Sequence, residues 1–357
     1  MTLSDQVATL TSFIENGFQQ NLKTGAVFLD FTAAYDTVWH TAFFTKVSKS
    51  MPYWFTRLVG LLLRDRRFNV HMGNDTSSWR PQRNSLPQGS VLTLVLFNLY
   101  SKNMPVTRGW KFIYADDICL ATQGKYFSKL EFSFSSDMAQ MSHFCWQWRF
   151  KPNTTETISS VFHLHNTSAT CELSVSLDGK RLRHECHPTY LGVTLDPMLS
   201  CREHLTDCSQ AEESKQLADE ASLFHLGHDL RSSAQALCYL AAEYCAPVWS
   251  CSALTSQVDV QLNCTMRLIS GTLRSTPLPW LPMLSNIELP ALRKRLPLTS
   301  WWRKSSNLTV SQSSLISFTC HCYDWHPGSR CGWTCNQLTS NVDGGITGSR
   351  LRWSILT

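Results

Sequence analysis

The chain has 357 residues, of which 43% are hydrophobic and 17% charged, a globular composition with enough apolar side chains for a sizeable core. Lysines and arginines number 32 against 27 aspartates and glutamates, and the net charge of +5 is too small to indicate a class of partner by itself. The start of the chain lacks the pattern of a signal peptide, and no apolar run approaches the roughly 20 residues of a membrane helix, so we expect an intracellular protein without membrane partners.

The first predicted elements lead to an acid at the end of a strand. Apolar residues recur at helical spacing over residues 7–18, and Ser4 and Asp5 are placed to cap the start of that helix. The segment GAVFLDF, residues 25–31, is a continuous apolar run and predicts a buried strand. This strand delivers the carboxylate of Asp30 at its edge.

A helix, a hairpin and a second helix are predicted next. Residues 91–100, VLTLVLFNLY, are apolar on nearly every face, which indicates a helix buried on all sides. In KFIYADDICLA, residues 111–121, two apolar arms flank Asp116 and Asp117 and predict a tight hairpin with both acids at its tip. Apolar side chains three or four residues apart predict a long amphipathic helix over 127–148.

The remaining chain changes character twice. Short strands with a turn at Asp178 and Gly179 are expected over 160–196, and the pattern becomes helical from about residue 204. Beyond residue 305 the chain is rich in Ser, Thr, Gly and Asn, which predicts a poorly ordered tail. We therefore divide the chain into three regions: 1–203, 204–300 and 301–357.

The cysteines and the late basic residues each allow two interpretations. Most of the 14 cysteines are scattered as reduced, packed thiols would be, but four gather near the end of the chain: Cys320, Cys322, Cys331 and Cys335. Four thiolates can hold zinc, although the CxC and CxxxC spacings match a zinc site less well than two CxxC pairs. Seven basic residues and three tryptophans over 267–304 suit either nucleic acid or a solvated basic surface.

Adjacent Asp116 and Asp117 require compensating positive charge, because carboxylates repel each other and resist burial. Two Mg²⁺ ions meet this requirement, with Mn²⁺ as a substitute, since such ions take carboxylate oxygens and complete their shells with water and phosphates. Asp30 is a candidate for the third ligand. Such a cluster serves the attack of a hydroxyl on a nucleotide phosphate.

Four segments resemble, in order, the successive motifs of reverse transcriptases, and most closely those of non-LTR retrotransposons, the LINE and jockey-like mobile elements. They are AVFLDFTAAYDTVWH (26–40), LPQGSVLTLVLFNLYSKNMP (86–105), FIYADDICLA (112–121) and YLGVTLD (190–196). Two later segments, AEYCAPVW (242–249) and TPLPWLPMLSNI (276–287), resemble the region that follows these motifs in the same group. The resemblance spans about residues 5 to 295.

The resemblance implies an α+β fold with the palm of a right-hand polymerase, an antiparallel sheet backed by helices. It places the palm and incomplete fingers in 1–203 and a helical thumb in 204–300. It also implies roles for individual residues. These are Asp30, Asp116 and Asp117 as catalytic metal ligands, Tyr35 as the gate against a ribose 2′-hydroxyl, Gln88 and Gly89 in the nucleotide site, and Tyr190, Leu191 and Gly192 in primer positioning.

The roles implied for Tyr35, for Gln88 and Gly89, and for residues 190–192 each have a simpler alternative. Tyr35 can be a core tyrosine, and Pro87 with Gly89 can form an ordinary loop before a helix. The segment around Tyr190 can be any strand with a glycine bulge.

Several departures from the family pattern bear on activity. Glu156 stands where relatives commonly carry a lysine thought to protonate the leaving pyrophosphate, and an anion cannot replace a cationic acid facing phosphate. Leu94 occupies a place usually held by proline, and an acidic stretch over 207–220 is unlike a surface that faces a nucleic-acid duplex. We also expect an upstream fingers region and an endonuclease domain to be missing, as in a truncated copy.

The resemblance therefore predicts an RNA-directed DNA polymerase that takes an RNA template, a DNA primer and deoxynucleoside triphosphates, in the nucleus or in a cytoplasmic ribonucleoprotein. The alternative is a catalytically dead remnant that at most binds nucleic acid. An RNA-templated RNA polymerase is a third reading, which Tyr35 disfavours. The sequence does not indicate an oligomeric state.

Overall fold

The computed structural model describes residues 2–164, 171–210, 227–250, 252–288, 315–319, 334–340 and 346–352. The chain forms two compact units, Met1–Ser275 and Thr276–Thr357, whereas the sequence predicts boundaries at residues 203 and 300. None of the described helices is long and apolar enough to cross a membrane.

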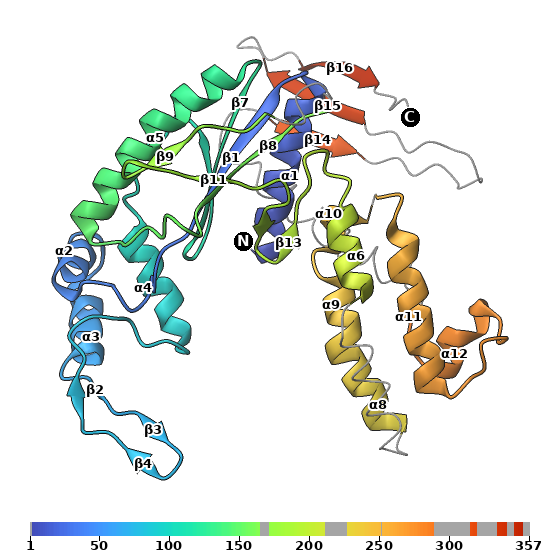
Figure 1. The fold of residues 1–357 in the computed structure, drawn as a ribbon, viewed down its shortest axis with the longest axis horizontal. Helices are drawn as coiled ribbons and strands as arrows, with labels where there is room; N and C mark the ends of the chain where they lie inside the picture. Colours follow the sequence, from blue (N-terminus) through green and yellow to red (C-terminus); the bar gives the residue numbers. More distant parts are fainter. Residues whose placement is uncertain are drawn as a thin grey trace. The chain divides into compact units, whose positions relative to one another are not determined.

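The first unit is built on a five-stranded sheet with the order β11-β8-β1-β7-β6 (Figure 1). Neighbouring strands are antiparallel except β8 and β11, which are parallel. The strands are β1 (Lys23–Leu29), β6 (Trp110–Tyr114), β7 (Asp117–Gly124), β8 (Ile158–Phe162) and β11 (Arg183–His184). The predicted α+β class, with mixed helices and a largely antiparallel sheet, is confirmed.

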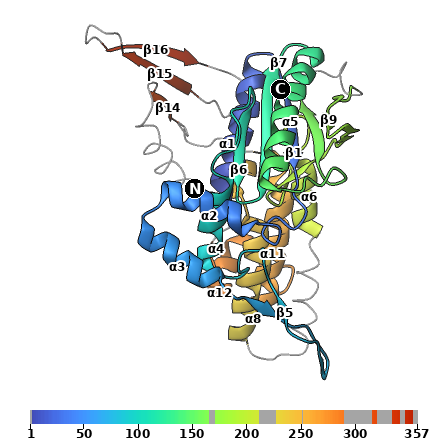
Figure 2. The same cartoon turned by 90° about the vertical axis from the view of Figure 1, so that its left-hand side faces the viewer.

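Helices cover both faces of this sheet, which explains why β1 is apolar at nearly every position. Val27 and Leu29 belong to the core with α5 (Phe127–Trp148). Ala26 and Phe28 belong to a second core with α1 (Leu3–Gln19) (Figure 1 and Figure 2). Successive strand side chains point to opposite faces, so a strand buried on both sides needs no polar alternation. The predicted strand at 25–31 and the helix at 127–148 are confirmed.

Helix α1 begins differently from the prediction. Thr2, and not Ser4, is its cap: Asp5 N donates to Thr2 Oγ1 at 3.2 Å and Thr2 N donates to Asp5 Oδ2 at 2.7 Å. The helix also continues through Gly17. A Cβ at Gly17 would lie 2.6 Å from Thr24 Oγ1, so glycine is required there by the close approach of the helix to β1.

Helix α4 (Val91–Ser101) corrects the prediction of burial on all sides. Leu96, Phe97 and Tyr100 are in the core, but Val91 is 88% exposed. The helix packs through one face, and an apolar composition alone does not determine which sides of a helix are covered. Ser90 caps its start by accepting a hydrogen bond from Leu92 N at 3.3 Å.

Two short hairpins follow α5, and both turn through two residues with positive φ. The predicted turn at Asp178 and Gly179 is confirmed, with φ of 51° and 78°. It joins β9 (Ser176–Leu177) to β10 (Lys180–Arg181), and a second turn joins β12 (Thr189–Tyr190) to β13 (Val193–Thr194). Positive φ at both central residues matches the right-handed twist of the flanking strands.

The region that follows residue 201 is mainly helical over its described residues, 202–210, 227–250 and 252–270, which confirms the helical pattern predicted from about residue 204. Its elements are α6 (Arg202–Gln210), α8 (Gly227–Ala234), the π-helical η2 (Gln235–Tyr239), α9 (Leu240–Glu243), α10 (Ala246–Trp249) and α11 (Thr255–Ser270). Most of the predicted acidic stretch, residues 211–220, lies outside the described residues.

The second unit contains η3 (Leu278–Trp280), α12 (Leu281–Ser285) and an antiparallel sheet of β14 (Leu315–Thr319), β15 (Thr334–Ser340) and β16 (Ile346–Arg352). These three strands add regular backbone to the segment predicted as a poorly ordered tail. Cys320, Cys322 and Cys331 and the basic residues of 289–304 lie outside the described residues, and Cys335 is in β15.

Helix α2 (His40–Ser50) carries a buried lysine inside an aromatic box. Lys46 Nζ lies 3.6 Å from the ring centroid of Trp148 and also contacts the rings of Tyr100 and Phe144. It donates a hydrogen bond to the carbonyl of Tyr100. Burial lowers the pKa of Lys46 from its usual 10.5 to about 8. The rings and the carbonyl offset part of the cost of burying the charge.

Replacing Lys46 with Met tests this charge. Below pH 8 both the folded and the unfolded chain carry the proton, and the cost of burial is fully present. Between pH 8 and 10.5 the folded chain releases the proton first, so the stability of the native chain rises with pH. We expect the difference in free energy of unfolding, native minus Lys46→Met, to increase over this window by up to about 3 kcal/mol. Urea titrations at several pH values measure it, and a constant difference would contradict the assignment.

Candidate active site

The sheet register places Asp30 beside Asp117. Leu29 in β1 pairs with Ile118 in the antiparallel strand β7. Asp30 follows Leu29 and Asp117 precedes Ile118, so these two acids lie across from each other. Asp116 is in the turn of the β6–β7 hairpin, where Tyr114 pairs with Asp117 and Ala115 has a φ of 54°. The predicted hairpin with Asp116 and Asp117 at its tip is therefore confirmed.

The three carboxylates interact electrostatically, and none of them forms an ion pair within the part of the chain that the structure describes. Partial burial, and then the carboxylates of Asp116 and Asp30, raise the pKa of Asp117, although its side chain reaches solvent. The ion pairs found in the described part of the chain involve other residues. Within the described ranges, no group of three or more His, Cys, Asp or Glu side chains is arranged so that it could hold a metal ion. The acids are thus neighbours, but they are not preassembled around one ion.

The backbone of Asp30 is held by the segment that follows α5. Asp30 N donates to Thr157 Oγ1 at 3.1 Å, and Asn153 N donates to Asp30 O at 2.9 Å. Thr157 is fully buried. No sequence motif points to Thr157, because its role depends on a contact 127 positions away along the chain.

Glu156, next to Thr157, lines a separate cavity of about 420 Å³ together with Arg183, Glu185 and His187. None of the three aspartates lines this cavity.

Tyr35 lies within electrostatic range of the acids. Burial first, and then the charges of Asp116 and Asp117, raise the pKa of Tyr35 to about 12. Its ring packs on Phe97 of α4 with 4.6 Å between centroids, and its carbonyl accepts a hydrogen bond from Leu86 N at 3.0 Å. The structure therefore brings Tyr35 together with two of the predicted acids.

The loop before α4 is tied to the residue that follows Tyr35. Asp36 Oδ1 accepts hydrogen bonds from Gln88 Nε2 and from Ser85 Oγ, both at 3.1 Å. Gly89 has a φ of 85°, a conformation that favours glycine, with open space where a Cβ would stand. Asp36 thus orients Gln88. The sequence offered one signal for this role, the position of Asp36 directly after the predicted gate.

The turn at Leu191 and Gly192 is fixed from both sides. Tyr190 is buried, and its hydroxyl donates to Phe112 O at 3.2 Å. Tyr244 Oη donates to Leu191 O at 2.6 Å, and a Cβ at Gly192 would lie 3.3 Å from the Tyr244 ring. Burial is the first cause of the raised pKa of Tyr190, and the charge of Asp117 contributes, so this hairpin lies within electrostatic range of the acids. The sequence patterns assign no role to Tyr244, although it lies in the segment AEYCAPVW.

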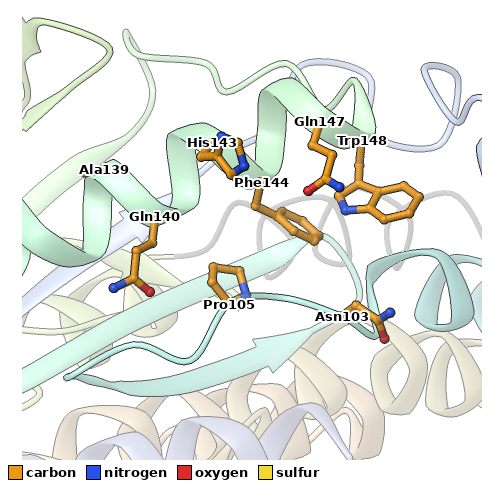
Figure 3. Close-up of a pocket in the computed structure, with 8 residues that line it drawn as sticks. All are labelled: Asn103, Pro105, Ala139, Gln140, His143, Phe144, Gln147 and Trp148. Carbon is orange, nitrogen blue, oxygen red and sulfur yellow. The ribbon is translucent and has the colours of Figure 1, made fainter.

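A cavity of about 580 Å³ lies elsewhere in the first unit. It is lined by the second half of α5 and by the segment after α4 (Figure 3). Gln140, Phe144 and Trp148 face Asn103 and Pro105 across it. None of the predicted site residues lines this cavity, so it is distinct from the cluster of acids.

Comparisons with known proteins agree on one family. Residues 3–195 match the model of the reverse transcriptase (RNA-dependent DNA polymerase) family. The chain is 30% identical over 210 residues to the "Probable RNA-directed DNA polymerase from transposon BS" of Drosophila melanogaster, covering 56% of this chain and 23% of that protein. It is 26% identical over 220 residues to the "RNA-directed DNA polymerase from mobile element jockey" of the same species, covering 59% and 24%.

A longer match and a solved structure complete the comparison. The "Probable RNA-directed DNA polymerase from transposon X-element" of Drosophila melanogaster is 24% identical over 280 residues, covering 75% of this chain and 30% of that protein. The chain thus spans about a quarter of the length of the curated relatives it matches. The structure of a Candida tropicalis telomerase with a fragment of telomeric RNA matches with a TM-score of 0.40 and 11% identity, covering 78% of this chain and 52% of that one.

Proposed function

The chain belongs to the reverse transcriptase family, and from this premise we propose that it is the RNA-directed DNA polymerase domain of a non-LTR retrotransposon. The observation that supports this most directly is the sheet register that sets Asp30 across from Asp117, with Asp116 in the adjacent turn. In this proposal the chain extends a DNA primer on an RNA template with deoxynucleoside triphosphates.

The donor set fits divalent cations. Three carboxylates lie near one another without an ion pair from the described chain, and partial burial, followed by repulsion from Asp116 and Asp30, raises the pKa of Asp117. Asp30, Asp116 and Asp117 would hold two Mg²⁺ or Mn²⁺ ions, with water and phosphate completing their shells. When bound, such ions supply activation of the primer 3′-hydroxyl and neutralisation of charge on the triphosphate.

The remaining residues position the substrates. Tyr35 lies within electrostatic range of Asp116 and Asp117, and in this proposal its ring would block a ribose 2′-hydroxyl. Gln88, held by Asp36, and the open backbone at Gly89 shape the nucleotide site. The turn of Leu191 and Gly192, anchored by Tyr190, would position the primer end.

The parts of a polymerase map onto the fold as follows. The five-stranded sheet with α1 and α5 forms the palm, and the helices from α6 to α11 form the thumb. Helices α2 and α3 (Tyr53–Leu63) with the loop before α4 contribute the partial fingers. This assignment rests on the family and on the order of the elements.

Primer extension on an RNA template tests the proposal, and Tyr35→Ala tests nucleotide selection. The intact chain with Mg²⁺ is expected to extend with deoxynucleotides and to reject ribonucleotides. Tyr35→Ala is expected to raise ribonucleotide incorporation at least about tenfold relative to deoxynucleotide, because a steric barrier to one hydroxyl is removed. Tyr35→Phe, which keeps the ring, is the matched control. Equal ribonucleotide use by the native chain would favour an RNA polymerase instead.

A second candidate is a remnant that binds nucleic acid without catalysis. Two observations favour it: Glu156 occupies the place of a cationic residue, and the three acids are not gathered around one point in the described chain. Binding of primer and template without any extension would support the remnant.

A further inference from the structure

Residues 53–83 form an exposed arm that contains none of the predicted site residues, although its helix α3 belongs to the partial fingers proposed above. The arm consists of α3 and a hairpin of four short strands: β2 (Arg67–Phe68), β3 (His71–Met72), β4 (Asp75–Thr76) and β5 (Arg80–Pro81). These strands pair only with one another, β2 with β5 and β3 with β4. In both views the hairpin projects beyond the end of α3 (Figure 1 and Figure 2).

The arm exposes large apolar and aromatic side chains. Trp54 and Trp79 are each 65% exposed, and Met72 is 79% exposed. Trp54, Leu58 and Leu61 recur at the spacing of one helix face, on the side of α3 opposite to buried Val59 and Leu63. Every residue from 71 to 80 is exposed, so the hairpin has no core beneath it. A two-stranded hairpin of this kind is only marginally stable in water by itself.

The arm also concentrates positive charge. It contains six arginines and no lysine against two aspartates, a net charge of +4, compared with +5 for the whole chain. Arg64 is paired with Asp65 at 3.3 Å, and Arg66 donates to Ser85 O at 3.2 Å. The other four make no ion pair or side-chain hydrogen bond with the described part of the chain, and all are exposed: Arg57, Arg67, Arg80 and Arg83.

Arginines and aromatic rings lie together within the hairpin. Phe68 pairs with Arg80 in the register and shares a face with it, while Arg67, one residue earlier, points to the opposite face. Trp79 directly precedes Arg80. Both surfaces of the hairpin therefore offer a guanidinium close to an apolar side chain.

We propose that this arm binds a single-stranded segment of nucleic acid, with the unpaired arginines on phosphates and Trp54, Phe68 and Trp79 stacking on bases. Exposed rings suit unpaired bases, because every base offers a π-face once it leaves a duplex. Four free arginines suit a polyanion, whereas an apolar protein partner would leave them without counter-charges. The inference goes beyond polymerase activity, since such binding needs neither nucleotide transfer nor the three aspartates.

Fluorescence anisotropy with a fluorescein-labelled single-stranded RNA, in EDTA and without nucleotides, tests the arm in the full chain. The pair Trp54→Ala and Trp79→Ala is expected to weaken binding at least about fivefold, by loss of stacking. The pair Arg67→Gln and Arg80→Gln is expected to flatten the dependence of log K on log salt by about 0.7 per arginine. All four side chains are exposed, so the thermal unfolding curves of these variants should match that of the native chain.

Matched controls remove similar groups elsewhere in the first unit. Trp146→Ala removes a tryptophan that is 80% exposed on α5, and Lys125→Gln with Lys129→Gln removes two exposed charges near the start of that helix. Both are expected to leave affinity near the native value. Asp116→Asn is expected to bind the RNA as the native chain does, so failure of the polymerase would leave this result unaffected.

Three outcomes would overturn the proposal. The first is unchanged affinity and salt dependence in both arm variants. The second is an equal loss in the controls. The third is sedimentation showing a dimer of the native chain that the tryptophan pair abolishes, because the arm would then be an interface between two copies.

Discussion

Replacing Asp116 with Asn is expected to lower the rate of primer extension by at least about a thousandfold. A divalent ion contributes several kcal/mol to stabilising charge in such a transfer, and each 1.36 kcal/mol corresponds to about tenfold in rate. Asn keeps the size of the side chain and removes the negative charge that, in the proposed function, would bind the ion. Asp30→Asn is expected to have an effect of the same order, since the register sets Asp30 across from Asp117.

Two comparisons separate this loss from a general defect. Glu172→Gln removes a carboxylate that is paired only with exposed Arg181, at 3.6 Å, and it should leave extension unchanged. The affinity of Asp116→Asn for primer and template, measured without metal, should stay near that of the native chain. Extension by Asp116→Asn at a tenth or more of the native rate would show that the carboxylate is not a metal ligand.

Trp249→Ala is expected to lower the free energy of unfolding by about 3–5 kcal/mol, the usual cost of truncating a buried aromatic side chain. Trp249 is fully buried, and its Nε1 donates to Tyr244 O at 2.8 Å. Tyr244 in turn holds Leu191 O, so the change should also loosen the turn at Leu191 and Gly192. Urea denaturation followed by circular dichroism measures the effect as a lower midpoint.

Conservative variants identify the cause. Trp249→Phe keeps most of the packing and loses the N–H donor, and it should cost about 1–2 kcal/mol. Trp146→Ala, at an exposed position, should change stability by less than about 0.5 kcal/mol. If Trp249→Ala stays within 1 kcal/mol of the native chain, the helical region does not depend on this side chain as the structure implies.

Sequence patterns predict the parts of the fold in which the spacing of apolar residues along the chain matches the faces that are buried in the structure. Residues 25–31 are apolar at nearly every position because both faces of β1 are covered, and the acids at 116 and 117 fall at a turn because apolar arms flank them. The helix over 127–148 was equally clear, since one stripe of it lies in the core. In these cases the pattern along the chain is the direct consequence of what each face contacts.

Other features depend on contacts that a pattern does not contain. Val91 is exposed although its helix is apolar on nearly every face, because burial depends on what packs against the helix. The roles of Thr157 and Tyr244 come from hydrogen bonds to residues far away in the sequence. The arm of residues 53–83 likewise carries no motif in the sequence. The role proposed for its arginines depends on their exposure, which the sequence alone does not show.

In the proposed polymerase, Asp30, Asp116 and Asp117 together hold a pair of divalent ions. Electron paramagnetic resonance of Mn²⁺ counts these ions on the chain bound to primer, RNA template and a non-extendable nucleotide. We predict two tightly bound Mn²⁺ per native chain and loss of this binding in Asp30→Asn. Equal binding in Asp30→Asn, or no tight binding by the native chain, would contradict the account.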